Sequence, residues 1–214
     1  MQYEDDDTPT IIGALHVPVK VARALEHVRC KDTTRWGLTD IGVKVDADHI
    51  RLSATNGHTL LRLTIPNIDT PVGSYQIAGG EAHVLAKTPP GVMPHGSQSL
   101  ALSTEDSFPD ADAVFPSGPR TAADAVGINP RYLREVADCY KDSTSTYAPK
   151  TKGSAVGFRR SGGSTVSPVT WEQGDRLSPV LVTWSFPLSA FESFGGADTR
   201  DCKAEMLLMP MRLD

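Results

Sequence analysis

The sequence predicts an α+β fold assembled from repeated β-α-β-β-β units. Two observations indicate this class: a strand pattern leads straight into an amphipathic helix, and short alternating strands then follow one another through tight turns. The first strand is expected at residues 11–17, and Pro18 suits the start of a helix over residues 19–30. Three strands with alternating apolar residues complete the unit, at residues 36–45, 49–54 and 59–65.

The same order of elements then begins again. A strand is expected at 74–78, a short helix at 80–88 and a strand at 99–103. After a Pro-rich linker at 107–119, further elements are expected as strands at 123–128, 155–160, 165–172, 179–186 and 203–209 and a helix at 130–141. We therefore predict two domains, residues 10–118 and 119–214, with an acidic, disordered tail at 1–9 and loops at 142–153 and 192–202.

Composition limits the kinds of protein that this chain can be. Its 214 residues are 39% hydrophobic, and no apolar run approaches the roughly 18 residues needed to span a bilayer. The acidic N-terminus differs from a secretory signal, so we expect a cytoplasmic protein with no membrane partner. A net charge of -5 argues against a surface that binds nucleic acid everywhere, although a local basic face stays compatible with it.

The residues that usually carry catalysis form no recognisable pattern. The sequence has no Gly-rich phosphate loop, no Gly-x-Ser-x-Gly and no His-Glu-x-x-His. Its six His are scattered, and its three Cys lack the spacing of a metal site or a disulfide framework. The acidic run at residues 5–7 is typical of a solvated tail. We therefore predict a protein that is not an enzyme and holds no metal or cofactor.

The segment from Met206 to Asp214 is unusually apolar for the end of a chain. We expect a final strand that leads into a rigid, extended hook, because Pro210 fixes its own φ and keeps Met209 extended. Two interpretations stay open. The strand could simply fill the core, or its Met side chains could form an adaptable surface for apolar partners.

Three segments resemble a known family in the same order. Residues 54–60 read Ala-Thr-Asn-Gly-His-Thr-Leu, residues 108–116 read Phe-Pro-Asp-Ala-Asp-Ala-Val-Phe-Pro, and residues 209–213 read Met-Pro-Met-Arg-Leu. Together they resemble the bacterial sliding clamp, the beta subunit of DNA polymerase III. The chain departs from that pattern at Asn56, where the family has Asp, at Thr59, where it has Arg, at residues 112–113 and at Asp214. Residues 146–203 match it poorly.

The resemblance implies the DNA-clamp fold, in which helices line a channel and sheets form the outside of a ring. The family's chain is longer and has three such domains, and this one resembles the second and third. The implied function is that of a processivity factor that encircles duplex DNA without reading its sequence and tethers a replicative polymerase. A polymerase or clamp loader would bind through a short peptide in an apolar groove formed by Thr55, Gly57, His58, Leu60, Pro109, Val114, Leu208, Met209, Pro210, Met211 and Leu213.

The expected helices also carry basic residues that could meet DNA phosphates. Lys20, Arg23, His27 and Lys31 follow one another at helical spacing, and a solvated helix face usually mixes charges of both signs. For Lys87 and Lys141, an ordinary solvated position on a helix face is an equally good interpretation. The predicted DNA-binding set is Lys20, Arg23, His27, Lys31, Lys87, Arg131, Arg134 and Lys141.

The resemblance also leads to a prediction of assembly. The family's ring has six domains, so chains of two domains would close it as a homotrimer of about 70 kDa. An alternative stays open: an interaction protein could keep the peptide groove without closing a ring and act as a decoy or regulator of clamp partners. Peptide binding is common to both functions, and only the first requires a closed multimer.

Overall fold

A computed structural model describes the chain over most of the predicted elements. The residues that it describes are 11–35, 37–87, 97–104, 108–115, 121–122, 129–144, 169–173, 179–187 and 201–209. The predicted tail at 1–9, the predicted strands at 123–128 and 155–160 and most of the loops at 142–153 and 192–202 lie outside these residues.

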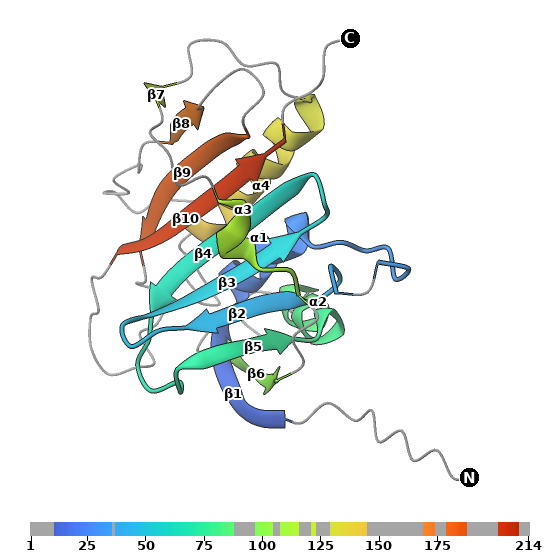
Figure 1. The fold of residues 1–214 in the computed structure, drawn as a ribbon, viewed down its shortest axis with the longest axis vertical. Helices are drawn as coiled ribbons and strands as arrows, with labels where there is room; N and C mark the ends of the chain where they lie inside the picture. Colours follow the sequence, from blue (N-terminus) through green and yellow to red (C-terminus); the bar gives the residue numbers. More distant parts are fainter. Residues whose placement is uncertain are drawn as a thin grey trace, which may run out of the picture.

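Ten antiparallel strands form one continuous sheet (Figure 1). The strands are β1 (Ile11–Pro18), β2 (Ile41–Val45), β3 (His49–Thr55), β4 (Thr59–Pro66), β5 (Gly73–Ile77), β6 (Ser97–Ser103), β7 (Thr121–Ala122), β8 (Thr170–Gln173), β9 (Val180–Pro187) and β10 (Asp201–Leu208). Their order across the sheet is β1-β6-β5-β2-β3-β4-β10-β9-β8-β7. The mixed α/β fold with a large antiparallel sheet agrees with the predicted class.

The strand β10 joins the two halves of the sheet. It pairs with β4 on one side, where Met206 lies opposite Leu61, and with β9 on the other, where Met206 lies opposite Val182. A strand from the predicted second domain therefore completes the sheet of the predicted first.

Three helices cover one face of this sheet and a short one lies on the other (Figure 1). The covering helices are α1 (Val19–Val28), α2 (Gly79–Lys87) and α4 (Pro130–Thr144), with α1 between the other two. The short helix α3 (Ala111–Val114) lies across the opposite face. The side chains of β2 alternate between the two faces of the sheet. Val43 and Val45 are buried under the three helices, whereas Lys44 points to the other face and contacts α3.

The main core lies between the sheet and its three helices. Val21, Leu25 and Val28 of α1 are buried there, as their spacing predicts. A second, smaller cluster lies on the opposite face, where Leu60, Leu181 and Leu207 pack against Ala111 and Phe115 of the α3 segment. Burying a side chain of this size contributes about 1.5–3 kcal/mol, so the large core dominates the stability of the fold.

Several predicted boundaries are wrong in ways that have a local cause. The strand expected at 36–45 begins only at Ile41, because Gly37 adopts φ 88° in the preceding turn. Helix α1 ends at Val28, so Lys31 follows the helix instead of continuing its basic face. The Pro-rich linker contains a helix, α3, and α4 extends to Thr144, into the loop expected at 142–153.

Candidate functional site

The hairpin between β3 and β4 is held by its own side chains. Gly57 adopts φ 86°, which a residue with a Cβ rarely does, so glycine is required at this turn. The Thr55 hydroxyl donates to the Thr59 carbonyl over 2.7 Å and accepts from the Gly57 amide over 3.1 Å. The Asn56 side-chain oxygen accepts from the amides of His58 and Thr59, each over 2.9 Å. Bonds within five consecutive residues therefore fix the shape of the turn.

Two further bonds fix this hairpin against distant parts of the chain. The buried Thr59 hydroxyl donates to a carboxylate oxygen of Glu135 in α4 over 3.0 Å. The amide of Met209, just after β10, donates to the His58 carbonyl over 3.1 Å. Thr59 stands where the resembling family has Arg, and here it ties the hairpin to a helix instead of presenting a charge.

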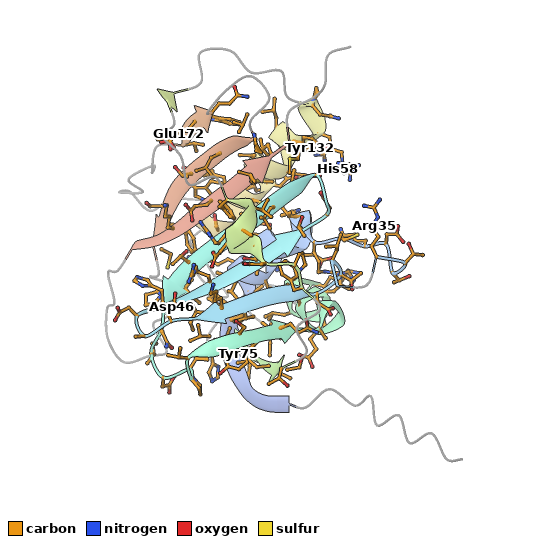
Figure 2. The ribbon with its side chains drawn as sticks, viewed as in Figure 1. Arg35, Asp46, His58, Tyr75, Tyr132 and Glu172 are labelled. Carbon is orange, nitrogen blue, oxygen red and sulfur yellow. The ribbon has the colours of Figure 1, made fainter. Side chains whose placement is uncertain are left out.

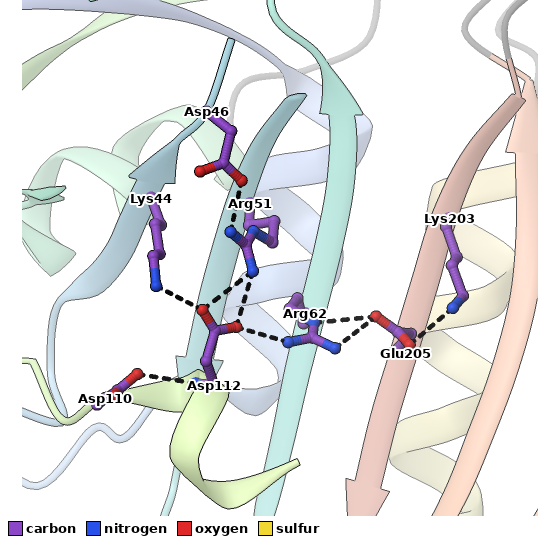
Figure 3. Close-up of polar contacts among 8 residues, drawn as sticks. All are labelled: Lys44, Asp46, Arg51, Arg62, Asp110, Asp112, Lys203 and Glu205. Atoms are coloured by element: carbon purple, nitrogen blue, oxygen red, sulfur yellow. Dashed lines mark hydrogen bonds and ion pairs between the residues drawn. The ribbon is translucent and has the colours of Figure 1, made fainter. Parts of the chain in front are cut away.

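The carboxylate of Asp112 fixes α3 to the sheet (Figure 3). It accepts from Lys44 over 2.6 Å, from Arg51 over 3.0 Å and from Arg62 over 2.8 Å. Arg62 in turn pairs with Glu205 of β10 over 2.8 Å, and its guanidinium lies 3.7 Å from the centre of the Phe115 ring. One short helix is thus fastened to β2, β3 and β4, and through Arg62 to β10.

The surrounding cations keep the carboxylates of this network ionised. Partial burial alone would raise the pKa of Asp112, but the hydrogen bond from Lys44 and the charge of Arg51 outweigh burial and lower it. The pKa of Glu205 is lowered in the same way, because Lys203 and Arg62 outweigh a larger burial effect. The ion pairs that hold α3 therefore persist at neutral pH.

An apolar cavity of about 190 Å³ opens between the hairpin, α3 and the end of β10. Its lining residues come from four separate segments of the chain: Leu38, Thr55, Gly57, His58, Thr59, Leu60, Phe108, Pro109, Asp110, Ala111, Val114, Leu207 and Met209. We call this space the α3 cavity. Val114 and Met209 are exposed large apolar side chains at its rim.

The structure brings together seven residues of the predicted groove: Thr55, Gly57, His58, Leu60, Pro109, Val114 and Met209 all line the α3 cavity. Leu208 is a correction, because the pleat of β10 turns it into the main core, and Leu207 lines the cavity in its place. Pro210, Met211 and Leu213 lie outside the described residues. The predicted groove lacked six of the lining residues: Leu38, Thr59, Phe108, Asp110, Ala111 and Leu207. Of these, Leu207 could have been found from strand alternation.

Lys20 is a second correction, because it is not accessible to DNA in this structure. It is only 4% exposed, and its Nζ lies 5.8 Å from the centre of the Phe186 ring of β9. Burial lowers the pKa of this amine despite an opposing effect of Cys202. The helical spacing correctly placed Lys20 on α1 but could not show that β9 covers it.

The other predicted cations lie on or beside the helices that cover the sheet. Arg23 donates to the Ala86 carbonyl of α2 over 2.9 Å, and His27 lies 2.8 Å from the Asp142 carboxylate of α4. These two side chains therefore bind neighbouring helices. The remaining residues of the set are exposed to solvent: Lys31, Lys87, Arg131, Arg134 and Lys141.

Three solved structures with a similar fold are bacterial sliding clamps. A sliding clamp (DNA polymerase III subunit beta) from Bartonella birtlesii, bound to griselimycin, is similar with a TM-score of 0.58 and 13% identity over 98% of this chain and 68% of that one. The chain has the fold of a sliding clamp. The Pseudomonas aeruginosa clamp, also bound to griselimycin, is similar with a TM-score of 0.54 and 13% identity over 99% of this chain and 68% of that one. For the Thermotoga maritima beta subunit the TM-score is 0.56 and the identity 12%, over 100% of this chain and 70% of that one.

These similarities concern the fold, since the identities are low. No protein-family model and no curated protein matches the chain. Within the part of the chain that the structure describes, no helix is long and apolar enough to cross a membrane, and no three His, Cys, Asp or Glu residues gather as a metal site. The three Cys are buried and form no disulfide bond with one another.

Proposed function

We propose that this protein is a sliding clamp, a non-catalytic processivity factor that encircles duplex DNA and tethers a replicative polymerase. The observation that supports the proposal most directly is the α3 cavity. Its walls combine the β3–β4 hairpin, the segment around α3 and the end of β10, which are the three segments that resemble the clamp family in sequence. The clamp-like fold and the position of the α3 cavity thus support the same function.

The α3 cavity suits an apolar peptide side chain. Its volume of about 190 Å³ accommodates one or two such side chains, and its lining is mostly aliphatic and aromatic. Met209 at the rim is 38% exposed and can adapt to partners of different shape. The polymerase and the clamp loader are proposed to bind here through short peptide motifs, by burying an apolar anchor that is hidden from water only in the complex.

The helix-covered face is proposed to face DNA. Its exposed cations, among them Lys87, Arg134 and Lys141, would meet phosphates without contacting base edges, as sliding requires. Replacing these three by Ala should flatten the salt dependence of DNA association, by about 0.9 in the log–log slope for each phosphate that is no longer neutralised. An unchanged slope would place these cations outside a DNA channel.

A ring is proposed to form by pairing of the sheet edges. Among the described strands, β1 and β7 are at the two ends of the sheet and each has one neighbour. Joining β1 of one copy to β7 of the next covers both edges by a head-to-tail contact, and such a contact closes into a ring or continues into a filament. A six-domain ring takes three copies, which gives a homotrimer of about 70 kDa.

The groove is tested with griselimycin, the ligand in the Bartonella and Pseudomonas clamp structures. Calorimetric titration of the full chain should show binding, and Val114→Glu should weaken it at least about tenfold by placing a charge at the rim of the α3 cavity. Val72→Glu is the matched control, since Val72 is 68% exposed and does not line this cavity. Equal loss in both variants, or no binding by the wild type, would overturn the proposed groove.

Light scattering at micromolar concentration tests the ring. A species near 70 kDa supports the homotrimer. A species of 23 kDa alone, in a chain that still binds griselimycin, would exclude the ring and leave the alternative function of a groove-bearing decoy or regulator.

A further inference from the structure

A second, larger cavity lies on the other side of the His58 hairpin. Its volume is about 370 Å³, and its walls come from the end of α1, the loop after it, the hairpin and the start of α4. The α3 cavity has a single carboxylate in its lining, Asp110, whereas this cavity is lined mainly by charged side chains. Its permanent cations are Arg29, Lys31, Arg35 and Arg131, and Asp32 is its one lining carboxylate. We call it the basic cavity.

Three of these cations are accessible to a ligand. Arg29 is not, because its guanidinium is bound by Glu26 and by the carbonyls of Cys30 and Thr39. Lys31 and Arg131 have exposed side chains, and their ion pairs with Glu26 and Glu135 are long, at 3.8 and 3.3 Å. Arg35 is exposed and forms no ion pair with a carboxylate of the described residues.

The acidic groups near this cavity leave a positive surplus. Asp32 accepts hydrogen bonds from the amide and hydroxyl of Thr34, over 3.0 and 2.7 Å, and stays ionised, because these bonds and the charge of Arg35 lower its pKa. Glu26 pairs with Arg29, and Glu135 is shared between Arg131 and the Thr59 hydroxyl. The four cations exceed these three carboxylates by one charge, and this surplus favours an anion in the basic cavity.

His58 connects the basic cavity to the α3 cavity, because its side chain lines both. Its ring stacks on Tyr132 of α4, with 6.4 Å between ring centres. Figure 2 shows Arg35, His58 and Tyr132 along the same edge of the molecule. Arg35 also reaches the hairpin, since a Cβ at Gly57 would lie only 3.4 Å from its terminal nitrogen. A ligand that crosses His58 thus passes directly from an apolar cavity to a basic one.

We propose that the groove selects peptides in which acidic residues flank the apolar anchor. The anchor fills the α3 cavity, the backbone crosses His58, and the carboxylates lie against Lys31, Arg35 and Arg131. The inference rests on the proposed function and specifies which partner peptides this chain accepts. Extended peptides suit the site, because the two cavities lie on either side of His58 in the β3–β4 hairpin instead of forming a single deep pocket.

The test compares two capped, fluorescein-labelled peptides by anisotropy. One is Asp-Asp-Asp-Ser-Leu-Leu-Phe, and its matched counterpart has Ser in place of each Asp; both are also made in reverse order. We expect one order of the acidic peptide to bind at least about tenfold more tightly than its neutral counterpart at low salt. Arg35→Ala and Arg131→Ala should each lower the affinity for the acidic peptide about fivefold and leave the neutral peptide unchanged.

Arg134→Ala is the matched control, since Arg134 lies on α4 beside Arg131, is 85% exposed and does not line the basic cavity. Equal affinity for acidic and neutral peptides, with both displaced by griselimycin, would overturn this inference and leave the proposed groove intact. No binding of either peptide or of griselimycin would overturn both. Loss of duplex DNA association in Arg35→Ala, with peptide selectivity unchanged, would assign the basic cavity to phosphates and also overturn the inference.

Discussion

Leu207 and Leu208 are neighbours on β10, are both fully buried, and belong to different parts of the molecule. Leu208 packs into the main core beneath the three helices, whereas Leu207 packs into the small cluster under α3. The helix side is extensive and apolar. The α3 side is narrow and depends on an ion-pair network around Asp112. The difference shows that stability and the candidate site occupy opposite faces of one strand, so each can be altered with limited effect on the other.

The largest expected effect is on the helix side. Leu208→Ala should lower the free energy of unfolding by about 2–5 kcal/mol, because it leaves a cavity in the main core. Chemical denaturation followed by circular dichroism measures this loss. Griselimycin affinity of the folded protein should stay within about twofold of the wild type. A mild stability loss accompanied by loss of ligand binding would mean that Leu208 belongs to the groove after all.

On the α3 side, Met209→Ala should weaken binding of griselimycin or of the acidic peptide by about 1–3 kcal/mol, as expected for an apolar anchor contact. Stability should fall by less than about 1 kcal/mol, since the side chain is already partly exposed. Ile68→Ala is the control, because Ile68 is 58% exposed and lies outside both cavities. The comparison of the two faces breaks down if Met209→Ala unfolds the protein as readily as Leu208→Ala does.

The buried amine of Lys20 gives a smaller effect on the helix side. Lys20→Met keeps the volume and removes the cost of a buried charge, so we expect stability at pH 7 to hold or to rise by about 1 kcal/mol. Because the folded pKa of Lys20 is lowered, the unfolded chain binds its proton more readily. The stability of the wild type should therefore rise, relative to the variant, as pH increases toward the ordinary lysine value. If the wild type instead loses stability relative to the variant over this pH range, the charged form of Lys20 stabilises the fold.

The smallest effect concerns Asp112. Asp112→Asn should cost about 1 kcal/mol at pH 7, the scale of partly exposed ion pairs, and should widen the α3 cavity by loosening the helix. Since the folded pKa of Asp112 is lowered, its contribution is complete above the ordinary aspartate pKa and is lost as pH falls below that value. The free energies of unfolding of wild type and variant should therefore converge when they are measured from pH 6 down to pH 3. A difference between the two that stays constant over this pH range would exclude an ionic role for Asp112.

Local chemistry made much of the fold and part of the candidate site predictable. Alternating residues and the Asn-Gly turn placed β3 and β4 within a residue or two, and the apolar spacing of α1 identified its buried face. Gly57, His58 and Pro109 were expected at a groove because the segments that contain them resemble the sliding-clamp family. Such short motifs can be recognised without knowing where the rest of the chain lies.

Features that depend on distant segments were not predictable in this way. Periodicity placed Lys20 on the helix, but only the position of Phe186 in β9 decides that it is covered. The helix α3 has four residues and no apolar repeat, so the Pro-rich composition suggested a linker. The basic cavity joins loop residues such as Arg35 to Arg131 of α4, and no sequence spacing relates the two.

The position of β10 between β4 and β9 has a consequence for how the chain folds. Arg62 and Glu205, which pair across the β4–β10 ladder, are separated by 143 residues. Until β10 arrives, β4 presents a bare hydrogen-bonding edge rich in leucine, and closing so long a loop is slow compared with forming the β2–β3–β4 hairpins. We expect refolding to show an early phase from the hairpins and a late phase from this ladder. At high protein concentration, β10 of one molecule can add to β4 of another, which makes strand exchange the characteristic misfolding route of this architecture.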